Sequence, residues 1–176
     1  ADGRDNDADG LADCADGVEG ADKGALLVMD LNQFKEVNDA LGHHHGDRLL
    51  IELSGRLSAI AGDEHVIARL GGDEFAMIIA GGTPRQALEI AGHIGRSFAE
   101  PIVIDGVTLQ TNVSVGIALY PEHAADADGL MQRADAAMYR AKEEGRNTFR
   151  FFSSEINTAS LGELLLENDL YGALER

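Results

Sequence analysis

The hydrophobic residues of the chain follow two alternating patterns from residue 25 to residue 152. Short continuous apolar runs, which are typical of buried strands, occupy residues 25–31 and 113–119. Apolar residues that recur with a helical period predict amphipathic helices. These helices cover residues 47–60, 84–98 and 127–144, and a shorter helical segment ends at Gly42. The helix at 84–98 is predicted to have Thr83 as its N-cap and Pro84 at its first position.

Two hairpins and a closing strand complete the pattern. The hairpins cover residues 65–80 and 102–109, the second through an Asp-Gly turn, and the last strand covers residues 148–152. The strand region of the second hairpin continues through residues 113–119, so the predicted order is β-α-α-β-β-α-β-β-α-β. It indicates an α+β fold with a mixed, mainly antiparallel sheet, packed helices, a βαββαβ core and one added hairpin.

The hairpin at residues 65–80 has an unusual tip, Gly71-Gly72-Asp73-Glu74. Glycine supplies the positive φ that a tight turn needs, but a plain turn needs neither a second glycine nor two acids. Residues without side chains let a phosphate approach the backbone, and paired carboxylates can hold a divalent metal against it. The tip therefore predicts one wall of a metal-dependent nucleotide site.

Further charged residues lie at the ends of other predicted elements. Asp30 ends the first strand; it either caps the following helix or shares a metal with Asp73, if the two strands are neighbours. Asp47 either caps its own helix or faces a ligand. Lys142 and Arg146 flank the end of the last helix, where cations favour the helix dipole. That interpretation is weakened here because the cations come together with the acids.

Composition excludes several classes of protein. A formal net charge of −17 argues against a general nucleic-acid or anionic-membrane surface, because both need clustered Lys and Arg. The single cysteine, Cys14, excludes an intramolecular disulfide and fits a reducing compartment. No apolar run approaches the roughly 18 residues of a membrane span, and no signal peptide is visible. We therefore expect a cytoplasmic domain, with any membrane tether of the natural protein outside this sequence.

Two other metal patterns are weaker. Residues 1–24 contain eight acids, and Asp5-x-Asp7-x-Asp9-Gly10 resembles a calcium loop, although the final glutamate and the flanking helices are missing. We expect this segment to be an acidic lead-in, with calcium binding as the less favoured alternative. The consecutive histidines at positions 43–45 cannot easily face one zinc ion.

Five sequence blocks, in order, resemble the GGDEF family of diguanylate cyclase domains. The similarity covers residues 25–152, which we expect to be the domain itself, and is far more specific than a lone Gly-Gly-Asp-Glu. The blocks are Asp30–Asp39, Leu41-Gly42-His43 with Gly46-Asp47, Arg69–Phe75, Ser114–Ala118, and Ala134–Lys142 with Gly145-Arg146-Asn147.

The resemblance implies a palm-like fold, similar to that of nucleotide polymerases and cyclases. It implies that each domain binds one GTP, with Mg²⁺ or Mn²⁺ as cofactor, and that a second copy of the domain is the partner in a homodimer. The 3′-hydroxyl of each GTP then attacks the α-phosphate of the other. The products are cyclic di-GMP and two pyrophosphates.

By position, the resemblance also implies residue roles. Asp30, Asp73 and the carbonyl of Leu31 would bind metal. Glu74 would be a further metal ligand or would assist deprotonation of the 3′-hydroxyl. Asn38 and Asp47 would read the guanine edge. The remaining substrate-binding residues would hold phosphates or let the backbone approach GTP: Phe34, Lys35, Gly71, Gly72, Lys142 and Arg146.

The chain departs from the family pattern in two places. The usual product-binding Arg-x-x-Asp is replaced by Gly62 and His65, so we predict no product binding by that motif. The usual N-terminal motif has only a faint echo at residues 9–13, too close to Asp30.

The tail, residues 153–176, resembles the linker that leads into an EAL phosphodiesterase domain. An active cyclase cut from a bifunctional protein is therefore the first hypothesis. The alternative is a low-activity or inactive GTP-binding domain that controls an attached EAL phosphodiesterase.

Overall fold

The computed structural model describes residues 23–145 and 148–153. Residues 1–22 of the predicted lead-in (1–24), almost all of the predicted linker helix, Cys14 and Arg146 lie outside the described residues, and Gly24 already belongs to the first strand. Within these residues lie seven strands and four helices. They are β1 (Gly24–Asn32), α2 (Phe34–Leu41), α3 (His43–Ala61), β2 (Val66–Gly71), β3 (Glu74–Ala80), α4 (Pro84–Ala99), β4 (Ile102–Ile104), β5 (Val107–Leu109), β6 (Asn112–Tyr120), α5 (Ala127–Glu143) and β7 (Phe149–Phe151). This is one strand more than predicted, because β5 and β6 are separate strands rather than one continuous strand region.

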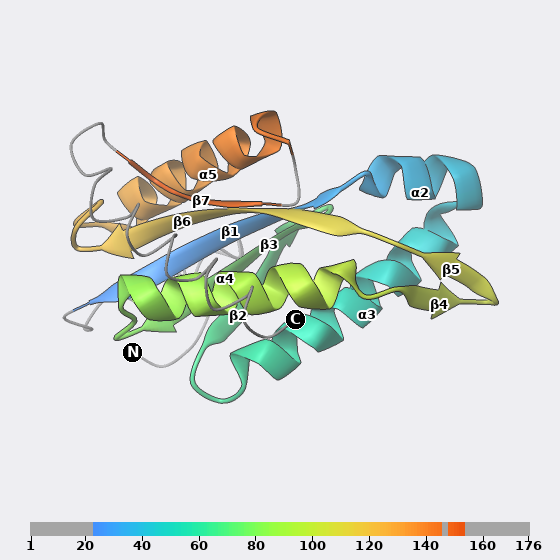
Figure 1. Cartoon of the computed structure of the whole chain (residues 1–176), viewed down its shortest axis with the longest axis horizontal. Coiled ribbons are helices and arrows are strands. Elements are labelled where there is room, and N and C mark those ends of the chain that lie inside the picture. The colour runs from blue at the N-terminus through green and yellow to red at the C-terminus, as the bar shows by residue number, and fades with distance from the viewer. Residues whose placement is uncertain (1–22, 146–147, 154–176) are drawn as a thin grey trace, which may run out of the picture.

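Five strands form the main sheet in the order β2-β3-β1-β6-β7 (Figure 1). β1 lies at its centre and pairs antiparallel with both β3 and β6. Only β7 runs parallel to its neighbour, β6. The predicted α+β class with a mixed, mainly antiparallel sheet is confirmed. The central strand is buried on both faces, which explains why it is a continuous apolar run rather than an alternating one.

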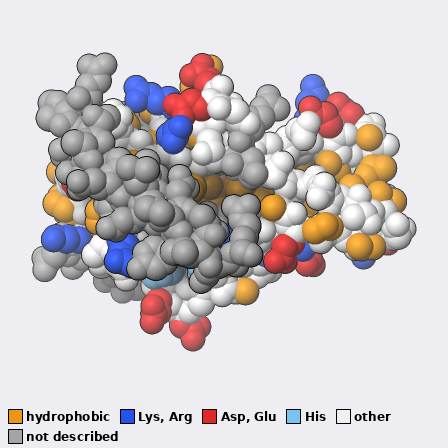
Figure 2. Space-filling view, viewed as in Figure 1, with side chains coloured by type: hydrophobic (Ala, Val, Ile, Leu, Met, Phe, Trp, Pro, Cys, Tyr) orange, Lys and Arg blue, Asp and Glu red, His pale blue; other side chains and the backbone are white. Residues whose placement is uncertain are grey.

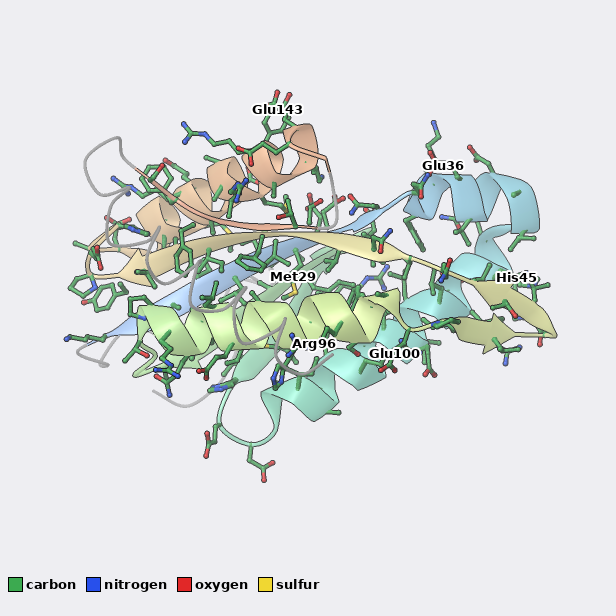
Figure 3. All side chains as sticks on the ribbon, in the orientation of Figure 1. Met29, Glu36, His45, Arg96, Glu100 and Glu143 are labelled. Carbon is green, nitrogen blue, oxygen red and sulfur yellow. The ribbon has the colours of Figure 1, made fainter. Side chains whose placement is uncertain are left out.

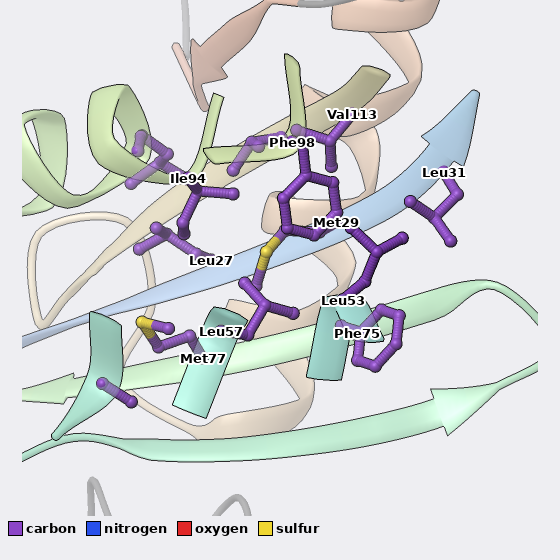
Figure 4. Packing of buried hydrophobic residues seen from close by; sticks show 14 of the residues in the cluster. Leu27, Met29, Leu31, Leu53, Leu57, Phe75, Met77, Ile94, Phe98 and Val113 are labelled. Atoms are coloured by element: carbon purple, nitrogen blue, oxygen red, sulfur yellow. The ribbon is translucent and has the colours of Figure 1, made fainter. Parts of the chain in front are cut away.

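The two faces of the sheet are covered by different helices (Figure 1). On one face, Leu27 and Met29 of β1 pack into the larger core with side chains of α3 and α4, among them Leu53 and Phe98 (Figure 4). Because side chains alternate along a strand, the intervening residues of β1 point to the other face. There Val28 packs with residues of α5.

The helix starts follow local sequence chemistry. Thr83 caps α4 as predicted: its side chain accepts a hydrogen bond from the backbone N–H of Gln86, and Pro84 follows at the first helical position. The predicted start of the preceding helix at Gly46-Asp47 is wrong. α3 begins at His43, after Gly42, so Asp47 lies inside the helix and is not its cap.

The added hairpin, β4–β5, forms a separate two-stranded sheet at one end of the molecule. Both residues of its turn, Asp105 and Gly106, have positive φ, as the Asp-Gly signal predicts. The Asp105 carboxylate forms an ion pair with Arg48, which fastens the hairpin to α3. The space-filling view shows hydrophobic side chains at this end (Figure 2), where Val103 is 68% exposed. Among the described helices, none has the length and apolar character needed to cross a membrane.

Candidate functional site

A row of three polar side chains crosses the central strands on the face that α5 covers. In the register of the sheet, Asp30 of β1 stands between Glu74 of β3 and Ser114 of β6. Two residues back along β1, on the same face, Val28 packs in the apolar cluster under α5. The row therefore lies on the same face of the sheet as this apolar cluster, beyond the residues that pack against α5. The condition for Asp30 and Asp73 to share a metal, that their strands are neighbours, is therefore met.

The hairpin tip is a two-residue turn, Gly72-Asp73, between the paired residues Gly71 and Glu74. Gly72 has φ of 51°. Arg69 donates two hydrogen bonds from its guanidinium to the Gly72 carbonyl, at 3.0 and 2.7 Å. The backbone N–H of Leu31 donates to the carbonyl of Asp73 at 3.3 Å. These bonds brace the turn and hold it against the end of β1, beside Asp30.

Lys142 reaches the row from α5. Its Nζ lies 2.7 Å from Oδ2 of Asp30, and the side chains are only 31% and 15% exposed, respectively. Asp30 lies within β1 and the N-cap position of α2 is Gln33, so the helix-cap alternative for Asp30 is wrong. The interpretation of Lys142 as a cation that only favours the dipole of α5 is incomplete, because its ammonium also pairs with Asp30.

The pKa values of both acids at the hairpin tip are raised. Burial, and then the nearby Asp30 carboxylate, raise the pKa of Asp73 above its ordinary value. The same two causes, in the same order, raise the pKa of Glu74, and Asp135 of α5 adds to the effect. Lys142 acts in the opposite direction on both groups. One ammonium therefore offsets the carboxylates only in part, and a further cation would be stabilised here.

A hollow of about 230 Å³ opens beside Asp30 and Asp73. It runs along the connection from β1 to α2, where Gln33 has a left-handed φ of 66°. Figure 3 shows Glu36 in the first turn of α2 and Glu143 at the end of α5, at the same edge of the molecule and both pointing outward. The lining residues are Asp30, Leu31, Asn32, Gln33, Phe34, Lys35, Glu36, Asp73 and Lys142.

Six of the predicted site residues thus line one hollow, although they come from four separate elements or turns. The other predicted residues within the described part do not line it: Glu74 belongs to the polar row, Gly71 and Gly72 to the hairpin tip, and Asn38 and Asp47 to the helices α2 and α3. Sequence reasoning missed Asn32, Gln33 and Glu36. For Asn32 a signal existed, because it is two residues after Asp30 and so shares its face of β1.

Asn38 is held against Gly46, the residue before Asp47. A Cβ atom at Gly46 would lie 2.0 Å from Oδ1 of Asn38, so only glycine leaves room for this side chain. Oδ1 of Asn38 is buried and has no hydrogen-bond partner among the described residues. The close approach of α2 and α3 therefore leaves a buried amide oxygen without a partner next to the residue that precedes Asp47.

The donor set suits a hard divalent cation. Carboxylates of Asp30, Asp73 and Glu74 are oxygen ligands of the kind Mg²⁺ prefers. Burial, and then the nearby Asp30 carboxylate, raise the pKa values of the last two, so a bound cation would favour their charged forms. Within residues 23–145 and 148–153, no three His, Cys, Asp or Glu side chains converge as a ready metal site. His45 instead uses Nδ1 in a 2.9 Å contact with the Leu41 carbonyl.

Comparison with known proteins identifies relatives of this arrangement. Residues 13–148 match the family described as Diguanylate cyclase, GGDEF domain. The chain is 45% identical, over 86% of its length, to the bifunctional diguanylate cyclase/cyclic di-GMP phosphodiesterase MucR of Pseudomonas aeruginosa. It is 42% identical, over 87% of its length, to the cyclic di-GMP phosphodiesterase PdeR of Escherichia coli.

The fold is also similar to solved structures. The crystal structure of the GGDEF domain of TpbB (or YfiN) from Pseudomonas aeruginosa matches with a TM-score of 0.73 and 41% identity, covering 77% of this chain and 85% of that one. The chain spans only 22% of the length of MucR and 23% of the length of PdeR. The similarity therefore concerns one domain of these longer proteins.

Proposed function

The chain belongs to the GGDEF domain family of diguanylate cyclases, and from that premise we propose that it condenses two molecules of GTP into cyclic di-GMP. In this reaction the 3′-oxygen of each GTP forms a bond to the α-phosphorus of the other. Each α-phosphorus loses pyrophosphate, and each 3′-hydroxyl loses its proton. The observation that carries the proposal is the juxtaposition of Asp30 with the Gly-Gly-Asp-Glu hairpin tip on adjacent strands.

In this proposal, different residues at the site bind the metal and the phosphates. Asp30, Asp73 and the Leu31 carbonyl would hold Mg²⁺ or Mn²⁺, with Glu74 as a further ligand or as an acceptor for the 3′-hydroxyl proton. The bound metal supplies charge neutralisation at the phosphates and alignment of the displacement. The backbone N–H groups around Phe34 and Lys35 would hold phosphate oxygens, because the first turn of α2 has no side-chain cap.

Further side chains would fix the rest of the nucleotide. Lys142 and Arg146 supply positive charge for the phosphates, and Gly71 and Gly72 keep the hairpin tip free of side chains that would block the backbone's approach. Asn38 and Asp47 would hydrogen-bond the guanine edge. In this assignment, one domain binds one GTP. Turnover therefore requires a second GGDEF domain, in a homodimer that brings two hollows face to face.

The alternative, a GTP-binding domain that controls an attached EAL phosphodiesterase without turnover, has less support. Both acids and both glycines of the tip are present, and Asp30 is in place beside them. The names of MucR and PdeR support a neighbouring phosphodiesterase domain in the longer protein. That neighbour is compatible with an active cyclase.

Product formation tests the proposal. The parent domain and Asp73→Ala are incubated with GTP and Mg²⁺ at high protein concentration, and GTP binding and cyclic di-GMP formation are measured separately. We expect turnover by the parent and none by Asp73→Ala. GTP binding by the parent without any cyclic di-GMP would favour the regulatory alternative, and absence of GTP binding would overturn both.

A further inference from the structure

Asn32, the last residue of β1, is a polar side chain with one unsatisfied end. Only 7% of the residue is exposed, and it lines the hollow beside Asp30 and Lys142. Ser114, which is fully buried on the neighbouring strand, donates a hydrogen bond from Oγ to Oδ1 of Asn32 at 3.0 Å. Nδ2 of Asn32 is buried and has no hydrogen-bond partner among the described residues. A buried amide donor without an acceptor is costly unless a ligand supplies one.

The hydrogen bond from the Ser114 hydroxyl determines which end of the Asn32 amide is available to a ligand. Because the hydroxyl donates to the oxygen of the Asn32 amide, that oxygen is occupied and the end left without a partner is the NH₂ group. The uncapped first turn of α2 borders the same hollow and offers backbone N–H groups. The hollow therefore has hydrogen-bond donors for anionic oxygens as well as the Asp30 and Asp73 carboxylates, which can bind a cation.

We infer that Asn32 binds the substrate directly, donating a hydrogen bond from Nδ2 to a phosphate oxygen or ribose hydroxyl of the nucleotide. Ser114 is the positioning residue that fixes the amide in this orientation. The inference rests on the proposed function, since it assigns a contact within the same nucleotide site. It adds two residues, from β1 and β6, to the residues of that site.

Binding measurements test the inference. Asn32→Leu removes the donor at similar volume, and Asn112→Leu is the matched control, because Asn112 pairs with Asn32 across the strands but does not line the hollow. Titration calorimetry with GTP and Mg²⁺ should show a Kd at least about tenfold higher for Asn32→Leu than for the parent. Asn112→Leu should bind as the parent does. The Kd for Mn²⁺ alone should be unchanged in both variants.

Ser114→Ala provides a second variant with a smaller change in volume. It should raise the Kd for GTP by roughly threefold, leave the Kd for Mn²⁺ unchanged and keep the cooperative thermal transition of the parent. This variant also decides the outcome if Asn32→Leu fails to fold. A purely structural role for Ser114 would lower the unfolding temperature without changing the Kd for GTP.

Deoxy nucleotides distinguish the two sources of the acceptor oxygen. If the acceptor is a ribose hydroxyl, 2′-deoxy-GTP or 3′-deoxy-GTP binds the parent more weakly, and Asn32→Leu does not discriminate it from GTP. If the acceptor is a phosphate oxygen, the variant loses the same factor for all three nucleotides. GTP binding by Asn32→Leu and Ser114→Ala equal to that of the parent would overturn the inference alone. A parent that does not bind GTP would overturn the proposed function as well.

Discussion

The Nζ atom of Lys142 lies 2.7 Å from Oδ2 of Asp30, which joins the last turns of α5 to the central strand of the sheet. Asp30 is also a candidate metal ligand, and one carboxylate oxygen cannot favourably contact an ammonium and a divalent cation at the same point. In the protein without nucleotide, the Lys142 ammonium therefore occupies the place beside Asp30 that a metal ion would take. In the proposed function, the triphosphate would give the ammonium other oxygens to contact and would free Asp30.

The first prediction concerns metal binding without nucleotide. Lys142→Met removes both the competition for Asp30 and the repulsion between ammonium and metal, so the Kd for Mn²⁺ should fall by about fivefold, corresponding to ~1 kcal/mol for a partly exposed ion pair. Electron paramagnetic resonance of free Mn²⁺ measures this Kd. GTP turnover should fall at the same time, because Lys142 no longer contacts phosphate.

Arg140→Met is the matched control for this experiment. It removes one positive charge from the same helix, at an exposed position away from the hollow. A general effect of net charge would lower the Kd for Mn²⁺ equally in both variants, and that result would contradict a specific competition at Asp30.

The second prediction concerns the pH dependence of stability. The pKa values of Asp73 and Glu74 are raised in the folded protein from ordinary values of 3.8 and 4.5. The folded state therefore binds these protons more tightly than the unfolded chain does. Without metal, stability falls as pH rises through the interval between the ordinary and the raised values, and it remains lower at neutral pH.

Asp73→Asn removes this loss, so its unfolding temperature at pH 7 should exceed that of the parent by about 1–3 °C. At pH 3 the difference should vanish, because the parent carboxyl is then protonated. Circular dichroism during heating, in the absence of divalent metal, measures both values. Asp63→Asn, at an exposed site in the loop after α3, controls for the change in net charge. An equal gain in that variant would assign the effect to overall charge.

The third prediction concerns guanine recognition. Gly46→Ala places a Cβ 2.0 Å from Oδ1 of Asn38 and must displace that amide. The KM for GTP should rise by roughly tenfold, as expected for the loss of a buried hydrogen bond, with kcat changed little. Gly55→Ala is the control, because its Cβ meets nothing within 4 Å on the same helix and should stabilise the protein by up to about 1 kcal/mol. An unchanged KM in Gly46→Ala would remove Asn38 from the guanine site.

The sequence predicted those features that depend on local pattern. The apolar run of β1, the Asp-Gly turn and the Thr83 cap are each determined by a few neighbouring residues, and each is found where expected. The predicted start of α3 was wrong because Gly46-Asp47 resembles a helix start. The chain instead bends at Gly42, and the histidines continue into the helix.

The geometry of the site could be predicted only in part. Strand adjacency was a condition in the sequence argument, since no local pattern indicates that β1 pairs with β3. The contact of Lys142 with Asp30 joins residues far apart in sequence and depends on the packing of α5. Asn32 was missed for the same reason: its importance comes from a hydrogen bond to Ser114 on another strand.

The last prediction concerns product inhibition. Gly62 and His65 occupy the positions where the family usually has the Arg and Asp of a product-binding motif. Initial rates of pyrophosphate release should therefore show no non-competitive inhibition by added cyclic di-GMP. Gly62→Arg combined with His65→Asp should introduce such inhibition. The exchange has a structural cost, because Gly62 has φ of 57° and ψ of −147°, a conformation that side chains disfavour by about 1–3 kcal/mol.

Urea unfolding should show this cost in Gly62→Ala as well, since the backbone strain does not depend on the guanidinium. Gly62→Ala combined with His65→Asp is thus the control. We expect it to be destabilised as much as the variant with Gly62→Arg, but to remain insensitive to cyclic di-GMP. Non-competitive inhibition of the parent would contradict the prediction and would indicate a product site built from other residues. Inhibition that GTP overcomes would instead mean that the product competes for the substrate hollow beside Asp30.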